Sequence, residues 1–277
     1  MLFKKLKAAA SVLTRAVREP AEFPLEIEAK LSQLHARAPV ETHLRILFQD
    51  ARIGAESFVE LYRRCLEQTG TAVTPFNVFA RFQCRLNLVR YFLATLPLPG
   101  ARAECGVYRG ASALLLCRAA RAQVPDYRGE GFYLIDSYEG ASKSRSHDLI
   151  AVRSGDGRVR REPFFPHAAG TSWLEDVRAV FREYPAARIV QGWVPQVLAG
   201  LPAARWSFVH LEVDLYEPTL GALEYFYPRL IPGGVIITDD YGSVFTPGGR
   251  KAWQDFCLLG DLPYVVLPGG QAVIVKG

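Results

Sequence analysis

The stretch from Trp206 to Ser243 constrains the fold most, because it reads as a strand, a helix and a second strand in direct succession. Its first part, SFVHLEVD, is apolar and ends on acids, as a buried strand does when it carries charge at its C-terminal end. The middle, TLGALEYFYPRL, has helical apolar spacing. After an IPGG turn, the buried strand VIIT ends at Asp239, Asp240 and Tyr241. This order predicts a right-handed parallel crossover within an α/β sheet.

Such a crossover places the carboxyl ends of both strands at one edge of the sheet, where open α/β sheets bind ligands. We therefore expect four side chains to lie near one another, namely Glu212, Asp214, Asp239 and Asp240. Clustered carboxylates repel unless a positive charge lies among them, and a hard divalent cation such as Mg²⁺ suits oxygen ligands. The alternative is that one or two of these acids are solvated loop residues or helix N-caps.

Composition bounds the class of protein. A chain of 277 residues is one large domain, or one domain with an extension. Its five cysteines lack CxxC spacing, which predicts reduced thiols in the cytoplasm and argues against a disulfide framework or a zinc site. The formal net charge of +5 comes from scattered arginines without an aromatic-rich basic cluster, so we expect no nucleic-acid partner. No apolar run is long enough to span a bilayer.

Residues 1–72 predict a helical extension that precedes a larger domain over residues 73–277. The opening segment, MLFKKLKAAASVLTRAVREP, is basic and amphipathic. We expect this helix to fray or to pack against another subunit, and the alternative is weak contact with an anionic membrane surface. Because helical N-terminal extensions often dimerise, we expect a homo-oligomer.

Regular alternation of strands and helices begins after the linker LPLPGAR. The segment ARAECGVYRGAS predicts a strand, a glycine turn and the start of a helix. Gly106 lets the backbone approach a ligand closely, while Gly110, Ala111 and Ser112 let the helix begin tightly against the strand. The free N–H groups at the helix start would then face the ligand. The pattern is not the G-x-G-x-x-G fingerprint of dinucleotide-binding proteins.

The next strands supply further candidates for a ligand site. Asp136 ends the strand GFYLID, and an acid in this position commonly accepts hydrogen bonds from ribose hydroxyls, although it could also cap a turn. Trp193 follows a third strand and could stack on a base or belong to the core. Residues 141–170 are polar and rich in Gly and Ser, which predicts a mobile lid over the site. The chain closes with YVVLPGGQAVIVKG, which predicts an antiparallel hairpin.

Five segments in this order resemble the macrocin O-methyltransferase family: AECGVYRGAS, FYLIDSYEG, GWVPQVLAGLP, EVDLYEPTLGALEYFYPRLIPGGVIITDDYG and the terminal hairpin. The resemblance covers residues 73–277. It implies a class I methyltransferase fold, that is, a doubly wound, mostly parallel seven-stranded Rossmann-like sheet ending in an antiparallel hairpin. It also implies Mg²⁺-dependent transfer of a methyl group from S-adenosylmethionine to sugar hydroxyls of natural products.

The resemblance also implies roles for residues of the glycine turn and of the strand after it. Glu104, Gly106 and Gly110 would line the methionine end of the cofactor, and Asp136 would hold its ribose. The residues that we expect to bind the cofactor are Glu104, Gly106, Tyr108, Gly110, Ser112, Asp136, Ser137 and Trp193.

At the acidic edge, the resemblance implies that Glu212, Asp239 and Asp240 bind the metal and that Asp214 is the general base. The chain departs from the family pattern in carrying Glu212 where aspartate is usual and Val213 in place of a polar spacer. The longer Glu212 side chain could shift the metal, bind it bidentately or leave Asp214 as the ligand. The division of roles between Glu212 and Asp214 therefore stays open.

The hypothesis is methylation of a vicinal diol, on a sugar or a catechol-like ring of a small molecule or glycan. Mg²⁺ would lower the pKa of the hydroxyls, and a neighbouring carboxylate would take the proton. One alternative is a non-catalytic module that binds S-adenosylmethionine or a nucleotide, but such a scaffold gains nothing from clustered carboxylates. Another is a nicotinamide-dependent oxidoreductase, against which the absent G-x-G-x-x-G pattern and the DDY strand end argue.

Overall fold

The computed structural model describes most of the residues that follow residue 50. It describes residues 51–74, 78, 81–153, 158–163, 172–202 and 204–277. The amphipathic segment that opens the chain lies outside the described residues, so its predicted helix and its proposed partners stay predictions.

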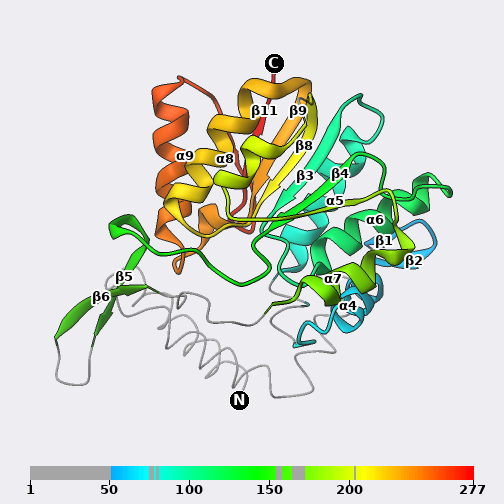
Figure 1. Cartoon of the computed structure of the whole chain (residues 1–277), viewed down its shortest axis with the longest axis horizontal. Helices are drawn as coiled ribbons and strands as arrows, with labels where there is room; N and C mark the ends of the chain where they lie inside the picture. The colour runs from blue at the N-terminus through cyan, green and yellow to red at the C-terminus, as the bar shows by residue number, and fades with distance from the viewer. Residues whose placement is uncertain (1–50, 75–77, 79–80, 154–157, 164–171, 203) are drawn as a thin grey trace, which may run out of the picture.

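The centre of the molecule is a seven-stranded sheet with the strand order β10-β11-β9-β8-β3-β4-β7 (Figure 1). Its strands are β3 (Ala101–Cys105), β4 (Phe132–Asp136), β7 (Arg188–Gln191), β8 (Trp206–Leu211), β9 (Leu230–Thr238), β10 (Val265–Val266) and β11 (Ala272–Val275). Neighbours from β9 to β7 are parallel, whereas β11 runs antiparallel to both β9 and β10. This topology confirms the predicted α/β class and the C-terminal antiparallel hairpin.

Helices cover both faces of this sheet, as a doubly wound fold requires. One hydrophobic cluster joins the sheet to α4 (Phe58–Gln68), α5 (Phe82–Thr95), α6 (Ala111–Gln123) and α7 (Leu174–Val180). A second cluster on the opposite face contains side chains of α8 (Tyr216–Phe226) and α9 (Pro247–Leu259) (Figure 1). Among the described residues, no helix combines the length and the apolar character needed to cross a membrane.

Short elements complete the described chain. They are β1 (Arg52–Ile53) and β2 (Glu56–Ser57), β5 (Leu149–Arg153) and β6 (Val159–Pro163), and the 3-10 turns η2 (Ser146–Asp148), η3 (Phe181–Glu183), η4 (Gln196–Gly200), η5 (Tyr227–Arg229) and η6 (Asp240–Gly242). The pairs β1–β2 and β5–β6 are antiparallel. Figure 1 shows the β5–β6 hairpin projecting from the body of the molecule, away from the central sheet.

One stretch differs from the sequence expectation. Residues 231–234, expected as a turn, form part of β9. The amide nitrogen of Gly233 donates to the carbonyl oxygen of Lys276 at 2.8 Å, and the amide nitrogen of Lys276 donates to the carbonyl oxygen of Gly234 at 2.9 Å. The chain beyond β11 therefore satisfies the backbone groups of these glycines and extends the strand through them.

The alternation of side chains along the strands decides which groups share a face. On β8, Val209 and Leu211 belong to the cluster under α8 and α9, whereas Phe208 belongs to the cluster under α5. His210 alternates with Val209 and Leu211 and therefore lies on the α5 face. Glu104 of β3 lies on this face too. The sheet thus directs polar side chains toward α5.

The predicted domain boundary and lid fall partly within the described residues. Buried side chains of α4 share the hydrophobic cluster of the sheet, although α4 lies within the proposed extension 1–72, and the boundary at residue 72 stays a prediction. At the start of the proposed lid, the Asp148 carboxylate accepts hydrogen bonds from the amide nitrogens of Tyr216 and Arg145, both at 2.7 Å. This contact ties η2 to the start of α8. Residues 154–157 and 164–170 of the proposed lid lie outside the described chain.

Candidate active site

The glycine turn between β3 and α6 lies against the acidic strand end. Gly106 has a φ of 88°, and a Cβ atom there would lie 1.9 Å from the carbonyl oxygen of Glu212. Glycine is therefore required because two backbones meet, whereas the sequence suggested close approach to a ligand. Gly110 precedes α6 with a φ of 90°, and a Cβ atom there would lie 2.9 Å from the Phe181 ring. The turn brings the expected cofactor site and the acidic edge together.

Asp136, at the end of β4, holds this turn in place. Its Oδ2 accepts a hydrogen bond from the amide nitrogen of Tyr108 at 2.8 Å, and its Oδ1 accepts one from the amide nitrogen of Tyr138 at 2.7 Å. Burial raises the pKa of Asp136, and these backbone hydrogen bonds oppose the shift. Ser137 lies beside it, and its hydroxyl donates to the carbonyl oxygen of Gly140 at 2.9 Å. The predicted ribose role of Asp136 is compatible with this position and stays a prediction.

Two aromatic candidates from the sequence lie near strand ends of the same edge. Tyr108 is 51% exposed, and its ring lies 5.0 Å from that of Trp173 in an edge-to-face arrangement. Trp193 follows β7 and lines a cavity of about 580 Å³ together with Lys143 and Arg145. The ligand-binding roles of both rings stay predictions.

A buried polar layer lies beneath the turn, on the face of the sheet toward α5. Glu104 is fully buried, and its Oε1 accepts a hydrogen bond from the Ser112 hydroxyl. His210 is also fully buried, with Nδ1 3.6 Å from Oε1 of Glu104 and Nε2 3.4 Å from Oδ1 of Asp239. Burial alone would lower the pKa of His210, but the Asp239 and Glu104 carboxylates raise it to about 10. The imidazolium therefore links the expected cofactor end to the acidic edge.

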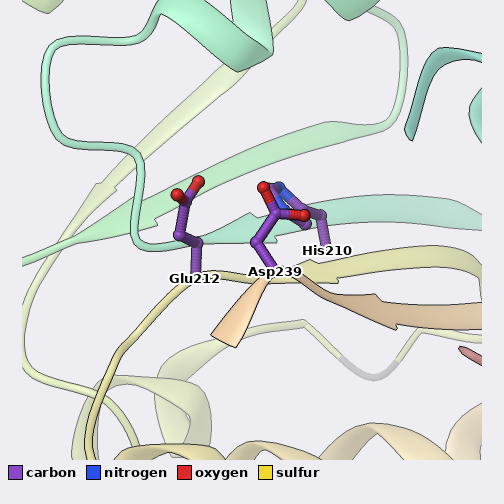
Figure 2. Close-up of side chains that lie close together, drawn as sticks. All are labelled: His210, Glu212 and Asp239. Atoms are coloured by element: carbon purple, nitrogen blue, oxygen red, sulfur yellow. The ribbon is translucent and has the colours of Figure 1, made fainter. Parts of the chain in front are cut away.

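Glu212 and Asp239 point toward a common region at the ends of β8 and β9, beside His210 (Figure 2). The Arg85 guanidinium bridges them: Nη1 lies 2.7 Å from Oδ2 of Asp239, and Nη2 lies 3.2 and 3.1 Å from the two carboxylate oxygens of Glu212. Arg81 also pairs with Oε1 of Glu212. The Gln271 side-chain amide donates to Oδ1 of Asp239 at 2.6 Å. Every carboxylate oxygen of this pair therefore accepts a hydrogen bond.

These contacts set the protonation states of the pair. Burial alone would raise the pKa of both carboxyl groups, but the guanidinium of Arg85 holds the pKa values of Glu212 and Asp239 below their ordinary range. Burial alone would lower the pKa of Arg85, but the two carboxylates raise it well above its ordinary value. The three groups therefore stay charged.

Asp214 and Asp240 form a second carboxylate pair. Oδ2 of Asp240 accepts a hydrogen bond from the Asp214 amide nitrogen at 2.9 Å, and Asp214 has a left-handed φ of 64°. Burial, followed by the charges of its acidic neighbours, raises the pKa of Asp240 to about 7 and that of Asp214 well above its ordinary value. The four acids thus divide into a pair bridged by arginine and a pair that can hold a proton.

Two of the three expected Mg²⁺ ligands, Glu212 and Asp239, lie close together at the strand ends. Among the described residues, only His210, Glu212 and Asp239 offer potential ligand atoms that all lie within 4.8 Å of one another, and Asp240 is not in this group. A cation between Glu212 and Asp239 would compete with Arg85 for the same oxygens. Arginine thus provides the positive charge that we expected among the carboxylates. The metal-ligand roles of Glu212, Asp239 and Asp240 stay a prediction of the resemblance.

Four side chains that contact the acids of this edge were not predicted from the sequence, namely Arg81, Arg85, His210 and Gln271. Two of them had a local signal. Arg85 interrupts the apolar pattern of its helix, between Cys84 and Leu86, and His210 interrupts an apolar strand. Buried charged residues are rarely left unpaired, so each interruption indicated a buried partner of opposite charge.

Comparisons with known proteins place this geometry in context. A family model described as Macrocin-O-methyltransferase (TylF) matches residues 83–263. The chain is 34% identical over 166 residues to the 8-demethyl-8-(2,3-dimethoxy-alpha-L-rhamnosyl)-tetracenomycin-C 4'-O-methyltransferase of Streptomyces olivaceus, covering 57% of this chain and 60% of that protein. It is 27% identical over 163 residues to the mycinamicin III 3''-O-methyltransferase of Micromonospora griseorubida, covering 57% and 61%. The chain thus spans about three fifths of the length of these relatives.

Solved structures show the same fold. The calicheamicin methyltransferase CalS11 has a TM-score of 0.56 at 21% identity and covers 79% of this chain and 92% of that one. The O-methyltransferase NovP has a TM-score of 0.55 at 21% identity and covers 78% and 88%. This likeness supports the class I methyltransferase fold expected from the sequence.

Proposed function

Because the chain belongs to the macrocin O-methyltransferase family, we propose that it transfers a methyl group from S-adenosylmethionine to a hydroxyl oxygen of a sugar or another vicinal diol. The contact that carries this proposal is the one between Gly106 and Glu212, since it sets the expected cofactor turn directly beside the acidic strand ends. Methyl transfer requires such proximity, because the sulfonium carbon and the acceptor oxygen must meet in line.

On the cofactor side, the N-terminus of α6, which begins after Gly110, and the Asp136 carboxylate are arranged around one turn. Helix N-termini favour negatively charged groups, which suits the cofactor carboxylate, and Asp136 is in the position that suits ribose hydroxyls. Glu104 and Ser112 lie directly beneath the turn and support it. Trp193, in its cavity beside Lys143, would contact the adenine.

On the acceptor side, Asp214 would act as the general base. The acceptor oxygen attacks the methyl carbon, the bond from carbon to sulfur breaks, and the hydroxyl proton passes to the Asp214 carboxylate, leaving S-adenosylhomocysteine and the methyl ether. Asp240 lies beside Asp214 and holds its backbone in position. Mg²⁺ dependence was expected from the resemblance, but no step is assigned to the metal here, because Arg85 bridges Glu212 and Asp239.

The remaining expectations belong to the same proposal. All five cysteines are unpaired and buried, which supports a reducing compartment such as the cytoplasm. We also propose a homo-oligomer and a small-molecule or glycan acceptor that is bound with the help of residues 1–72 and 141–170.

A methyl-transfer screen tests the proposal. The full-length protein is incubated with S-adenosylmethionine carrying a labelled methyl group and with a panel of glycosides that have vicinal hydroxyls. Matched deoxy-glycosides that lack one hydroxyl of each pair serve as controls. We expect label in the diol acceptors with wild type and loss of transfer in Asp214→Asn, which retains cofactor binding. Full methyl transfer by Asp214→Asn would contradict the role of Asp214 as the general base.

A further inference from the structure

The Arg85 guanidinium acts as a counter-ion that the protein itself places between Glu212 and Asp239. Arg85 contacts both carboxylates through different nitrogen atoms, at 2.7 Å to Asp239 and 3.1 Å to the nearer oxygen of Glu212. A planar guanidinium with donors at fixed positions suits such a bridge between two acids. In a metal-dependent site, a divalent cation would supply this positive charge.

Arg85 is held in place from several sides. Only 7% of its side chain is exposed, and it projects from the first turn of α5. Its Nε lies 3.5 Å from the hydroxyl of Tyr62, on the buried side of the helix. Moving Arg85 away to admit a metal ion would leave a guanidinium buried without its carboxylate partners, which is strongly unfavourable.

The surroundings also oppose an additional cation. Arg81 pairs with the same carboxylate of Glu212, and His210 lies between Asp239 and Glu104. A divalent ion at this position would therefore meet the two guanidinium groups of Arg81 and Arg85 at close range, and like charges repel strongly where water is excluded. The oxygens of Asp239 already have two good donors, Arg85 and Gln271.

We infer that Arg85, with Arg81, takes the place of the divalent cation at this sheet edge, so that the protein binds no metal between Glu212 and Asp239 and its reaction requires none. The reaction part of this inference rests on the proposed function, whereas the binding part does not. Arg81 has 42% of its side chain exposed, so its positive charge can reach an acceptor at the site. A fixed positive charge near the acceptor oxygen favours the deprotonated form, which is the role otherwise given to the metal.

The test is a calorimetric titration of Mn²⁺ into metal-stripped full-length protein, with and without saturating S-adenosylhomocysteine. Wild type is expected to show no saturable binding up to millimolar Mn²⁺. Saturable binding that is lost in a Glu212→Gln/Asp239→Asn variant would overturn the inference. Because S-adenosylhomocysteine is titrated separately, a failure of the proposed methyltransferase function would be seen there and not in the Mn²⁺ experiment.

A variant series tests whether the arginines exclude the metal. Arg81→Gln/Arg85→Gln uncovers both carboxylates and is expected to bind Mn²⁺ at least about tenfold more tightly than wild type, a difference of about 1.4 kcal/mol. Arg85→Lys keeps a positive charge and is expected to remain without Mn²⁺ binding. Arg90→Gln, an exposed position on the same helix, is the matched control. A folded double glutamine variant that gains no Mn²⁺ binding would contradict the assigned role of the arginines. If this variant does not fold, the wild-type titration and Arg85→Lys decide between the outcomes.

Discussion

Replacement of Arg85 by methionine gives the sharpest stability prediction. The change keeps an unbranched side chain of similar length but removes the charge that bridges Glu212 and Asp239. Both acids then face each other without their main counter-ion, in a region where only 6% of the Asp239 side chain is exposed. Removing one partner of a buried ion pair typically costs about 3–5 kcal/mol. At about 2–4 °C per kcal/mol, the melting temperature should fall by roughly 6–20 °C.

The pH dependence of this loss follows from the pKa shifts. In wild type, the lowered pKa values of Glu212 and Asp239 contribute stability that is present above the ordinary carboxyl pKa of about 4 and is lost as the pH falls toward the folded values. In Arg85→Met the same groups would have raised pKa values, and protonation would relieve their repulsion. The stability difference between wild type and variant should therefore be largest at pH 7–8 and should shrink toward pH 5.

Urea unfolding at a series of pH values measures this difference. Arg90→Met, at an exposed position on the same helix, should change the unfolding free energy by no more than about 0.5 kcal/mol. Adding Asp239→Asn to Arg85→Met should recover part of the loss, which a double-mutant cycle quantifies. A loss below about 1 kcal/mol that does not vary with pH would refute the view of Arg85 as a buried counter-ion.

Three further predictions concern the turn, the lid anchor and the thiols. Gly106→Ala should abolish S-adenosylhomocysteine binding or soluble expression, because its Cβ would lie 1.9 Å from the Glu212 carbonyl oxygen. Gly200→Ala is the control, since no atom lies within 4 Å of its Cβ, and it should be tolerated. A thermal-shift assay compares the two variants. Asp148→Ala should lower the unfolding free energy by about 1 kcal/mol and increase hydrogen exchange at the start of α8, because the amide of Tyr216 loses its acceptor; unchanged exchange would contradict the anchoring role. Burial raises the pKa of Cys65 to about 12 and that of Cys84 to about 11, so a disulfide reagent at pH 8 should label all five thiols only after unfolding; rapid labelling of either cysteine in the native protein would contradict the burial.

The parts of the fold that follow from local pattern were predictable. The strand-helix-strand unit from β8 to β9, the glycine turn and the terminal hairpin each have a short-range signal, and the structure contains all three. The extension of β9 through Gly233 and Gly234 was not predictable in this way, because its hydrogen-bond partners come from the far end of the chain.

The separation of the four acids into two pairs with different partners was only partly predictable from the sequence. Asp239 and Asp240 are consecutive, and consecutive side chains after a strand tend to point to opposite faces. The resemblance implied one shared metal site for both, whereas the structure pairs Asp239 with Arg85 and Asp240 with the amide nitrogen of Asp214. The partner of Glu212 could not be predicted from the local sequence, since Arg85 precedes it by 127 positions in the chain and lies on α5. Pairing across such a separation depends on how α5 packs on the sheet.

The most direct test of the central proposal is a calorimetric titration of S-adenosylhomocysteine into the metal-stripped, full-length protein. We predict a dissociation constant in the micromolar range that is unchanged by Mg²⁺. Asp136→Asn should bind at least about tenfold more weakly, as expected for loss of a charged hydrogen-bond acceptor. Glu139→Gln, at an exposed neighbouring position, should bind like wild type. Absence of binding by wild type, with or without Mg²⁺, would contradict the assignment of this sheet edge as a methyltransferase site.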